Sequence, residues 1–70
     1  MINKTFMKRL NELNLPYKTY DMGIMIDLER IINNTAIAIT KEENNALMKL
    51  IKRYKLDYEY RGYYTAILVK

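Results

Sequence analysis

The chain of 70 residues contains no cysteine, no histidine and no serine. Without cysteine and histidine it has no disulfide bonds, no usual zinc ligands, no thiol nucleophile and no imidazole base. Without serine it also lacks the most common hydroxyl nucleophile. Only two glycines are present, too few for a glycine-rich loop that would cradle a phosphate group. These absences favour a protein that is not an enzyme and that uses no cofactor.

Long apolar segments are also missing. No stretch approaches the ~18 apolar residues of a membrane-spanning helix, and the first residues lack the regions of a signal peptide. We therefore expect a cytoplasmic protein with no membrane partner. Among carboxylates, Asp21, Asp27 and Glu29 flank one expected hairpin and are the candidate ligands for Mg²⁺. Because carboxylates beside a turn are usually solvated, we expect no metal site.

Half of the residues are hydrophobic, a large share for a short chain. We expect a single domain over residues 1–70, and a domain this small buries only about 60% of the surface of its unfolded chain. Either the core is unusually well filled, or part of the apolar surface is covered by a second copy in a homodimer or by an obligate partner. The net charge of +4 indicates a mild preference for anionic partners. Isoleucine, lysine and asparagine supply 24 of the 70 residues, which favours an AT-rich genome such as that of a low-GC bacterium or its phage.

The first part of the chain predicts a helix followed by a hairpin. Asn3 is a suitable N-cap, and Pro16 ends the helix at or before the residue that precedes it. Residues 17–20 and 24–28 alternate in polarity on either side of a turn, as strands of a hairpin do. The helix would bury apolar residues spaced by four, four and three positions, namely Ile2, Phe6, Leu10 and Leu13.

The middle of the chain leaves alternatives open. Residues 29–34 predict either one short helical turn or a continuation of the preceding strand, with a turn at Asn33-Asn34. Residues 35–40 are apolar on both faces, which is typical of a strand that is covered on both sides or central in a sheet. Asp27 interrupts an apolar run. It is either a buried charge paired with Arg30 or Lys18, or a residue on the solvent face of an edge strand, which we favour.

The clearest local signal is a capping box, in which Thr40 is the N-cap and Glu43 the third helical residue. It predicts a helix that ends near Lys55. Residues 56–60 then alternate as a strand, Arg61-Gly62 forms a turn, and residues 63–69 form the closing strand. The buried stripe of this second helix consists of Leu47, Leu50, Ile51 and Tyr54.

An imperfect repeat relates the two halves of the chain. Residues 3–28 align with residues 44–69 at an offset of 41, with six identities in 26 pairs. The matched positions are mostly those that a helix followed by a hairpin would bury. The sequence therefore predicts an α+β domain with the order α-β-β-β-α-β-β, a duplicated αββ unit, and both helices on one face of a mostly antiparallel sheet.

Two groups of residues are candidates for binding. The second helix carries a cationic face, which is either an ordinary solvated surface or a site for nucleic-acid phosphates, formed by Lys49, Lys52, Arg53 and Lys55. The last hairpin is rich in tyrosine and also carries an arginine; its candidate residues are Tyr60, Arg61, Tyr63 and Tyr64. These tyrosines would pack across strands, anchor a protein interface or stack on bases.

The order of the first five expected elements is similar to that of the double-stranded RNA-binding domain. The motifs of that family are missing, because Lys41-Glu42-Glu43 stands in place of its basic patch and a chain without histidine has no Gly-Pro-His loop. No function follows from this similarity.

The combination of high aromatic content and missing catalytic groups favours a small protein-binding module without enzymatic activity. The expected partner is a larger protein or a nucleoprotein, contacted through Tyr60, Arg61, Tyr63 and Tyr64. Size, charge and composition are similar to those of phage or mobile-element accessory proteins that inhibit a host factor or a defence complex. The alternative is a nucleic-acid-binding protein that uses Lys49, Lys52, Arg53 and Lys55 for phosphates and a hairpin tyrosine for stacking.

Overall fold

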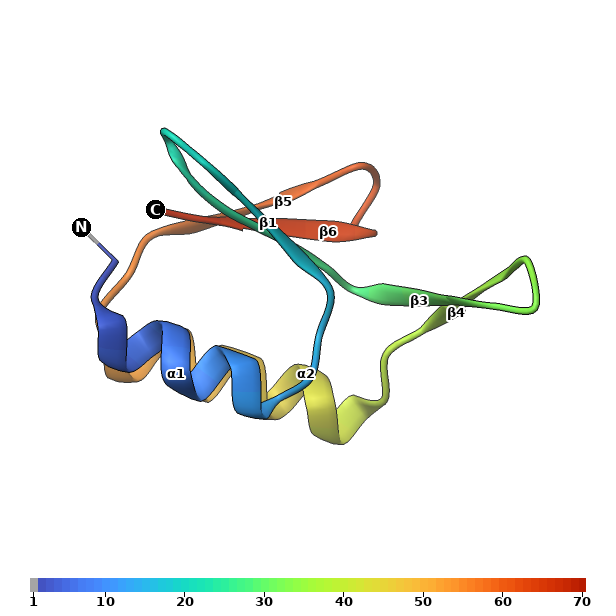
Figure 1. Cartoon of the computed structure of the whole chain (residues 1–70), viewed down its shortest axis with the longest axis horizontal. Coiled ribbons are helices and arrows are strands. Elements are labelled where there is room, and N and C mark those ends of the chain that lie inside the picture. The colour runs from blue at the N-terminus through green and yellow to red at the C-terminus, as the bar shows by residue number, and fades with distance from the viewer. Residues whose placement is uncertain (1) are drawn as a thin grey trace.

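A computed structural model describes residues 2–70 and has the α+β architecture that the sequence predicts, with one strand more (Figure 1). The order is α-β-β-β-β-α-β-β, because residues 29–32 continue as a strand and form no helical turn. The elements are α1 (Lys4–Glu12), β1 (Tyr17–Tyr20), β2 (Gly23–Asp27), β3 (Glu29–Ile32), β4 (Thr35–Ala38), α2 (Lys41–Arg53), β5 (Tyr58–Arg61) and β6 (Ala66–Val69).

The ends of both helices follow local signals in the sequence. The side chain of Asn3 accepts a hydrogen bond of 2.7 Å from the backbone N–H of Phe6 and caps α1. Thr40 and Glu43 form both hydrogen bonds of the predicted capping box at the start of α2. Asn14 and Lys55, with φ of 56° and 54°, leave the helical conformation just after α1 and α2. The sequence therefore determines where each helix begins and ends.

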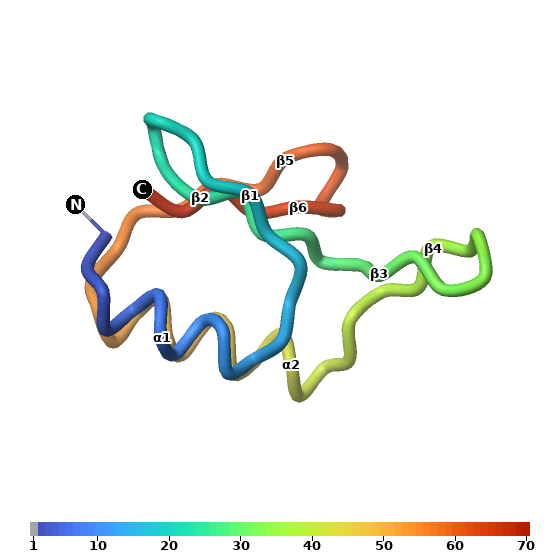
Figure 2. Tube along the Cα trace, viewed as in Figure 1, coloured from blue at the N-terminus to red at the C-terminus, as the bar shows by residue number. Residues whose placement is uncertain are grey.

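The main sheet is antiparallel and has the strand order β1-β2-β6-β5. In its centre, Ile26 of β2 lies directly opposite Ile67 of β6. These two residues are 41 positions apart, which is the offset of the sequence repeat. The repeat therefore folds as two αββ units related by a pseudo-twofold axis near this pair. Both helices lie on one face of the sheet and run in opposite directions (Figure 2).

The edge strands show where the two units differ. Tyr17 of β1 lies opposite Ile26, whereas Tyr60 of β5 lies opposite Ile67. Tyr60, and not Tyr58 as the sequence alignment indicated, is thus the structural equivalent of Tyr17. The reason is the longer loop in the second hairpin, where four residues join the strands in place of two.

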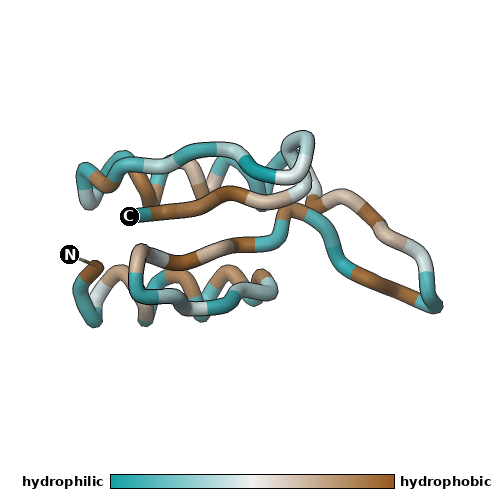
Figure 3. The backbone as a smooth tube through the Cα atoms, turned by 90° about the horizontal axis from the view of Figure 1, so that it is seen from above, coloured by the Kyte–Doolittle hydropathy of each residue, from teal (hydrophilic) through white to brown (hydrophobic). Residues whose placement is uncertain are grey.

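The core lies between the sheet and the helices. Its fully buried side chains come from both helices and from the two central strands, whose apolar character contrasts with the polar edge strands (Figure 3). Leu68 is also fully buried but belongs to the opposite face of the sheet, in register with Met25 and Glu59. Among the described residues, no buried residue is polar or charged. The main core consists of Phe6, Leu10, Leu15, Ile24, Ile26, Leu47, Leu50, Ile51, Ile67 and Val69.

Strands β3 and β4 form a separate two-stranded hairpin, here called the arm (residues 29–38), which projects from the body (Figure 1). Its turn is Asn33-Asn34, as predicted, and both residues have positive φ (52° and 62°), as a two-residue hairpin turn requires. The prediction that residues 35–40 are covered on both sides is wrong, because every residue of β4 is exposed. The central strands β2 and β6 already have neighbours on both sides, so the main sheet offers β4 no inner position.

Asp27 also differs from the prediction. It belongs to β2, which is a central strand and not an edge strand, and it is partly buried opposite Ala66. It lies on the face of the sheet that the helices do not cover. Arg30, one of its two predicted partners, pairs with Glu43 instead.

Candidate functional site

The loop between β5 and β6, residues 62–65, is the most unusual part of the backbone, and we call it the tyrosine loop. Gly62, Tyr63 and Tyr64 are consecutive and all have positive φ, of 57°, 55° and 71°. Thr65 closes the loop, because its hydroxyl donates a hydrogen bond of 2.7 Å to the carbonyl of Gly62. Glycine adopts this conformation freely, whereas it costs other residues about 1–2 kcal/mol each. Two tyrosines are thus held in an unfavourable backbone conformation.

Both tyrosines of this loop are in contact with solvent. Tyr63 is 99% exposed and Tyr64 is 72% exposed. The prediction that residues 63–69 form one strand is wrong at its start, because β6 begins only at Ala66. The loop therefore presents both rings outward, where the strand would have turned one of them to each face of the sheet.

A short ladder of aromatic rings connects the loop to the edge of the sheet. The ring of Tyr64 lies 4.9 Å from that of Tyr60, centroid to centroid, and Tyr58 meets Tyr60 edge to face at 6.1 Å. Tyr58 and Tyr60 are each 40% exposed, so neither is a core residue. Tyr63 takes no part in this ladder and extends alone from the tip.

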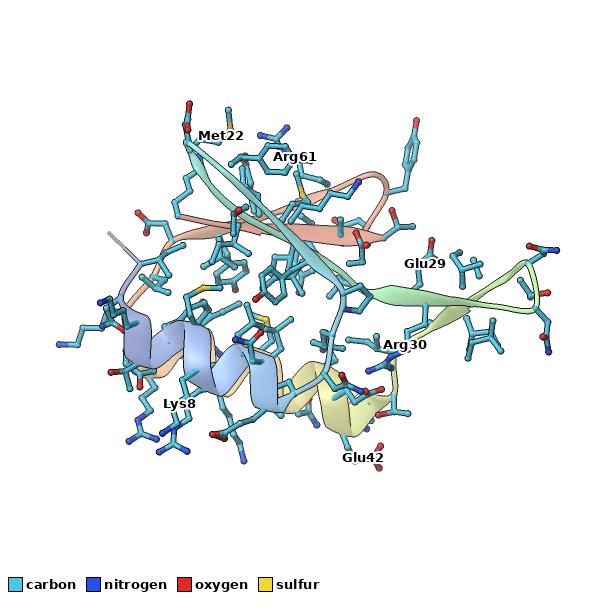
Figure 4. The ribbon with its side chains drawn as sticks, in the orientation of Figure 1. Lys8, Met22, Glu29, Arg30, Glu42 and Arg61 are labelled. Carbon is cyan, nitrogen blue, oxygen red and sulfur yellow. The ribbon has the colours of Figure 1, made fainter. Side chains whose placement is uncertain are left out.

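Arg61 does not join the tyrosines. It lies on the face of the sheet opposite the helices (Figure 4), in register with Ala66, and its Nε donates a hydrogen bond of 3.0 Å to Glu59. This hydrogen bond, with smaller contributions from the charges of Arg61 and Lys70, lowers the pKa of Glu59. Of the four residues predicted for protein binding, Tyr60 and Tyr64 are thus brought into contact, Tyr63 is adjacent in the loop, and Arg61 is turned away.

The predicted cationic face of α2 is exposed and larger than the sequence indicated. Because the helices are antiparallel, the first half of α1 lies beside the last half of α2 (Figure 1). In the described part of the chain none of these cations forms an ion pair. The set, here called the basic end, consists of Lys4, Lys8, Lys49, Lys52, Arg53 and Lys55. Sequence reasoning missed the two α1 lysines, which only the antiparallel packing identifies.

The basic end and the tyrosine loop lie on opposite sides of the molecule. The basic end is formed by the helices at the end of the molecule away from the arm, whereas the β5–β6 loop lies above the sheet near the base of the arm (Figure 1). Lys8 and Glu42 lie toward opposite ends of the helical layer (Figure 4). The combination of phosphate-binding lysines with a stacking hairpin tyrosine, which the sequence suggested, is therefore not brought together.

A cluster at the base of the arm was not predicted. Arg30 of β3 donates hydrogen bonds to both carboxylate oxygens of Glu43, one of them 3.0 Å long, and another of 3.0 Å to the carbonyl of Asn14. Arg30 and the backbone N–H of Thr40 are the main reasons why the pKa of Glu43 falls to about 2. Arg30 lies at the base of the arm (Figure 4), and its hydrogen bonds connect the arm to the start of α2 and to the end of α1.

An open pocket of about 510 Å³ lies between the start of α1, the β1–β2 turn and the last residue. Its ionisable groups are Tyr20, Asp21 and Lys70, and no hydrogen bond within the described chain links them. Asp21, Asp27 and Glu29 do not gather, since no three acidic residues among residues 2–70 are placed to hold a metal ion.

Within residues 2–70, neither helix combines the length and the hydrophobicity needed to cross a lipid bilayer. Comparison with known proteins gives no assignment, since no family model, no curated protein and no solved structure matches this chain.

Proposed function

We propose that this chain is a small, non-enzymatic protein-binding module that docks on a larger partner through the tyrosine loop. The observation that carries this proposal is the full exposure of Tyr63, at 99%, on a backbone with φ of 55°. A large aromatic ring in water gains nothing from packing, and its left-handed backbone costs free energy. Strain of this kind persists at sites where binding requires it.

The chemistry of the loop suits a protein surface. Tyrosine is enriched among the residues that dominate interface energies, because it offers a large rigid ring and a polar hydroxyl. The ring of Tyr64 is held by its contact with Tyr60 at 4.9 Å and is therefore partly ordered before binding. Preorganised side chains lose less conformational entropy when a partner docks.

A biological setting follows from composition. A chain of 70 residues without cysteine, histidine or serine has few catalytic groups, and its asparagine-, isoleucine- and lysine-rich sequence fits an AT-rich genome. We assign it to the phage or mobile-element accessory proteins that bind and inhibit a host enzyme or a defence complex. In this setting the partner is a host protein in the cytoplasm.

The test replaces Tyr63 by asparagine, which tolerates positive φ. Immobilised wild-type chain and the Tyr63→Asn variant are each exposed to lysate from a low-GC bacterium, and the retained proteins are identified by mass spectrometry. We expect a protein that the wild type retains and the variant releases, while urea unfolding shows equal or higher stability for the variant.

The matched control is Lys52→Ala, which removes an exposed side chain at the basic end. This variant should retain the same protein as the wild type. The proposal fails if no protein is retained specifically, or if Tyr63→Asn retains the same set with the same yield.

A second candidate function is binding of nucleic-acid phosphates, and the observation in its favour is the basic end. Six exposed cations without an ion pair in the described chain form a surface that would attract a polyanion. Because the tyrosine loop lies on the opposite side of the molecule, the basic end would bind through phosphate contacts only. Such contacts give affinity without sequence preference.

Titration of labelled single- and double-stranded DNA and RNA at two salt concentrations tests this candidate. Binding should weaken with salt, with a logarithmic slope of about −0.9 for each phosphate contacted on duplex DNA. Lys49→Ala should reduce that slope by about one unit, whereas Lys18→Ala on β1 should not. Absence of binding at low salt rejects the candidate.

A further inference from the structure

The arm exposes apolar side chains that a solitary small domain would be expected to cover. Ile31, Ile32 and Ile37 are 70%, 48% and 46% exposed, and they lie on both faces of a two-stranded hairpin. Within residues 2–70, neither strand of the arm has a second neighbouring strand. Isolated two-stranded hairpins are at best marginally stable in water, so pairing of this arm with a further strand would stabilise it.

The free edge of β4 is formed by alanines. Leu28 and Ile39 are opposite one another in the register of the arm, and the N–H of Ile39 donates to the carbonyl of Leu28 at 2.9 Å. Hydrogen-bonded and non-hydrogen-bonded pairs alternate along two antiparallel strands. The backbone N–H and C=O groups of Ile37, two residues before Ile39, therefore also point toward β3. Ala36 and Ala38, between these positions, point their N–H and C=O groups outward.

This edge lacks the protection that the other edges of the protein have. Lys18 lies in edge strand β1, and Glu59 and Arg61 lie in edge strand β5. By contrast, residues 31–40 contain no charged residue at all. Soluble proteins usually place charges, bulges or prolines on exposed edges, because an unprotected edge pairs with other strands. An edge with no such protection indicates that it is paired when the protein functions.

The charge distribution identifies the occupant of this edge. An uncharged apolar strand offers nothing to a nucleic acid and fits another uncharged apolar strand, which a second copy supplies. The basic end lies at the opposite end of the molecule from the arm, whereas Glu42 at the start of α2 lies nearer to the arm (Figure 4). Two copies that meet arm to arm therefore keep their most positive surfaces apart, although each carries a net charge of +4.

We propose that β4 pairs antiparallel with β4 of a second copy, giving a four-stranded sheet with the order β3-β4-β4-β3. The outward groups of Ala36 would bond to those of Ala38 in the partner, and Ile37 would lie on the two-fold axis. Opposite residues that do not share hydrogen bonds approach most closely in antiparallel sheets. The side chains of the two Ile37 residues would therefore be in contact.

The dimer should be weak and reversible. Strands of four residues bury much less than the ~800 Å² per partner of a standard interface. We expect a dissociation constant on the order of 100 µM. Sedimentation of the full chain from about 10 µM to about 1 mM spans this value and should show the monomer converting to a dimer.

Charge variants at Ile37 test the register. Ile37→Lys places two positive charges face to face and should weaken the dimer about tenfold or more. Ile31→Lys is the matched control, because Ile31 is more exposed, lies in β3 and is absent from the new interface. A mixture of Ile37→Lys and Ile37→Glu should dimerise more strongly than either variant alone.

Three results would overturn the proposal. The wild type would remain a monomer at every concentration, or Ile31→Lys would weaken the dimer as much as Ile37→Lys, or the mixture of opposite charges would dimerise no more strongly than either variant alone. Circular dichroism verifies that the variants are folded. The concentration series of the wild type shows, without any substitution, whether the chain dimerises at all. Tyr63→Asn should leave the dimer unchanged, which separates this inference from the function of the tyrosine loop.

Discussion

Glu43 shows how one side chain connects several parts of this small protein. Its carboxylate accepts hydrogen bonds from the Thr40 backbone N–H, at 2.9 Å, and from Arg30. It therefore caps α2 and anchors the arm at the same time. The capping box was predictable, because its partners are three residues apart. The contact with Arg30 was not predictable, because it depends on where the arm leaves the sheet.

The charge of Glu43 should make stability depend on pH. A pKa of about 2 in the folded chain, against an ordinary value of 4.5, means that protons favour the unfolded state between these values. The contribution of Glu43 is thus fully present above pH 4.5 and is lost as pH falls toward 2. Urea unfolding at a series of pH values should show that the wild type has a higher free energy of unfolding than Glu43→Gln above pH 4.5, and that this difference shrinks as the pH falls toward 2. An advantage that stays constant down to pH 2 would contradict the role given to this ion pair.

Gly23 is the position where the backbone tolerates no side chain. Its φ is 153°, and a Cβ atom there would collide with the carbonyl oxygen of Val69. Val69 lies in central strand β6 and cannot move without disturbing its neighbours. Gly23→Ala should therefore lower the free energy of unfolding by about 1–3 kcal/mol, measured by urea denaturation. Lys18→Ala in the adjacent strand should change it by less than about 0.5 kcal/mol, and equal effects of the two substitutions would reject this explanation.

Among the elements, α2 shows the clearest division between a buried and a solvated face. Leu47 is fully buried against the sheet, whereas Lys52 is exposed. Leu47→Ala should cost about 2–5 kcal/mol of stability and unfold much of the protein, because a domain of this size has little in reserve. Lys52→Ala should cost less than about 0.5 kcal/mol. Thermal and urea unfolding followed by circular dichroism measure both, and a large loss for Lys52→Ala would mean that the basic end is structural.

Local signals in the sequence were sufficient to place both helices and most of the strands, but not to show what covers them. Pro16 and the Asn33-Asn34 turn act through their own backbone preferences, so they could be located without knowing the fold. The apolar residues of the arm form the same pattern whether they lie in a core or in water. They are exposed because the main sheet ends where the N–H of Leu28 donates a hydrogen bond to the carbonyl of Thr65, and no other strand in residues 2–70 pairs with the arm.

The tyrosine loop illustrates the same limit within a candidate site. Composition and the Arg61-Gly62 turn signal located the residues, and alternation then assigned Tyr63 and Tyr64 to a strand. The two additional residues of this loop shift the register of β5, so that Tyr60 and not Tyr58 lies opposite Ile67. A loop length and a register depend on contacts across the sheet, which alternation along one strand does not contain.

On the scale of the whole molecule, a duplicated αββ body carries two features that break its symmetry. The body buries its apolar side chains between one sheet and two helices, with Ile26 and Ile67 at the centre. The arm between the units and the longer loop in the second unit have no counterpart in the first unit. The tyrosine loop and the edge of β4, on which we propose protein binding and dimerisation, both lie on these additions.

The central claim is that the αββ body is folded in a single chain, whereas the edge of β4 pairs with a second copy. Amide hydrogen exchange followed by NMR at several protein concentrations tests it most directly. The amides of Ile26 and Ile67 should exchange slowly at every concentration, because they lie in central strands. Those of Ala36 and Ala38 should exchange rapidly in dilute solution and slow down as concentration rises. Exchange at Ala36 and Ala38 that is as slow as at Ile67 in the most dilute sample, or rapid at every concentration, would contradict the account.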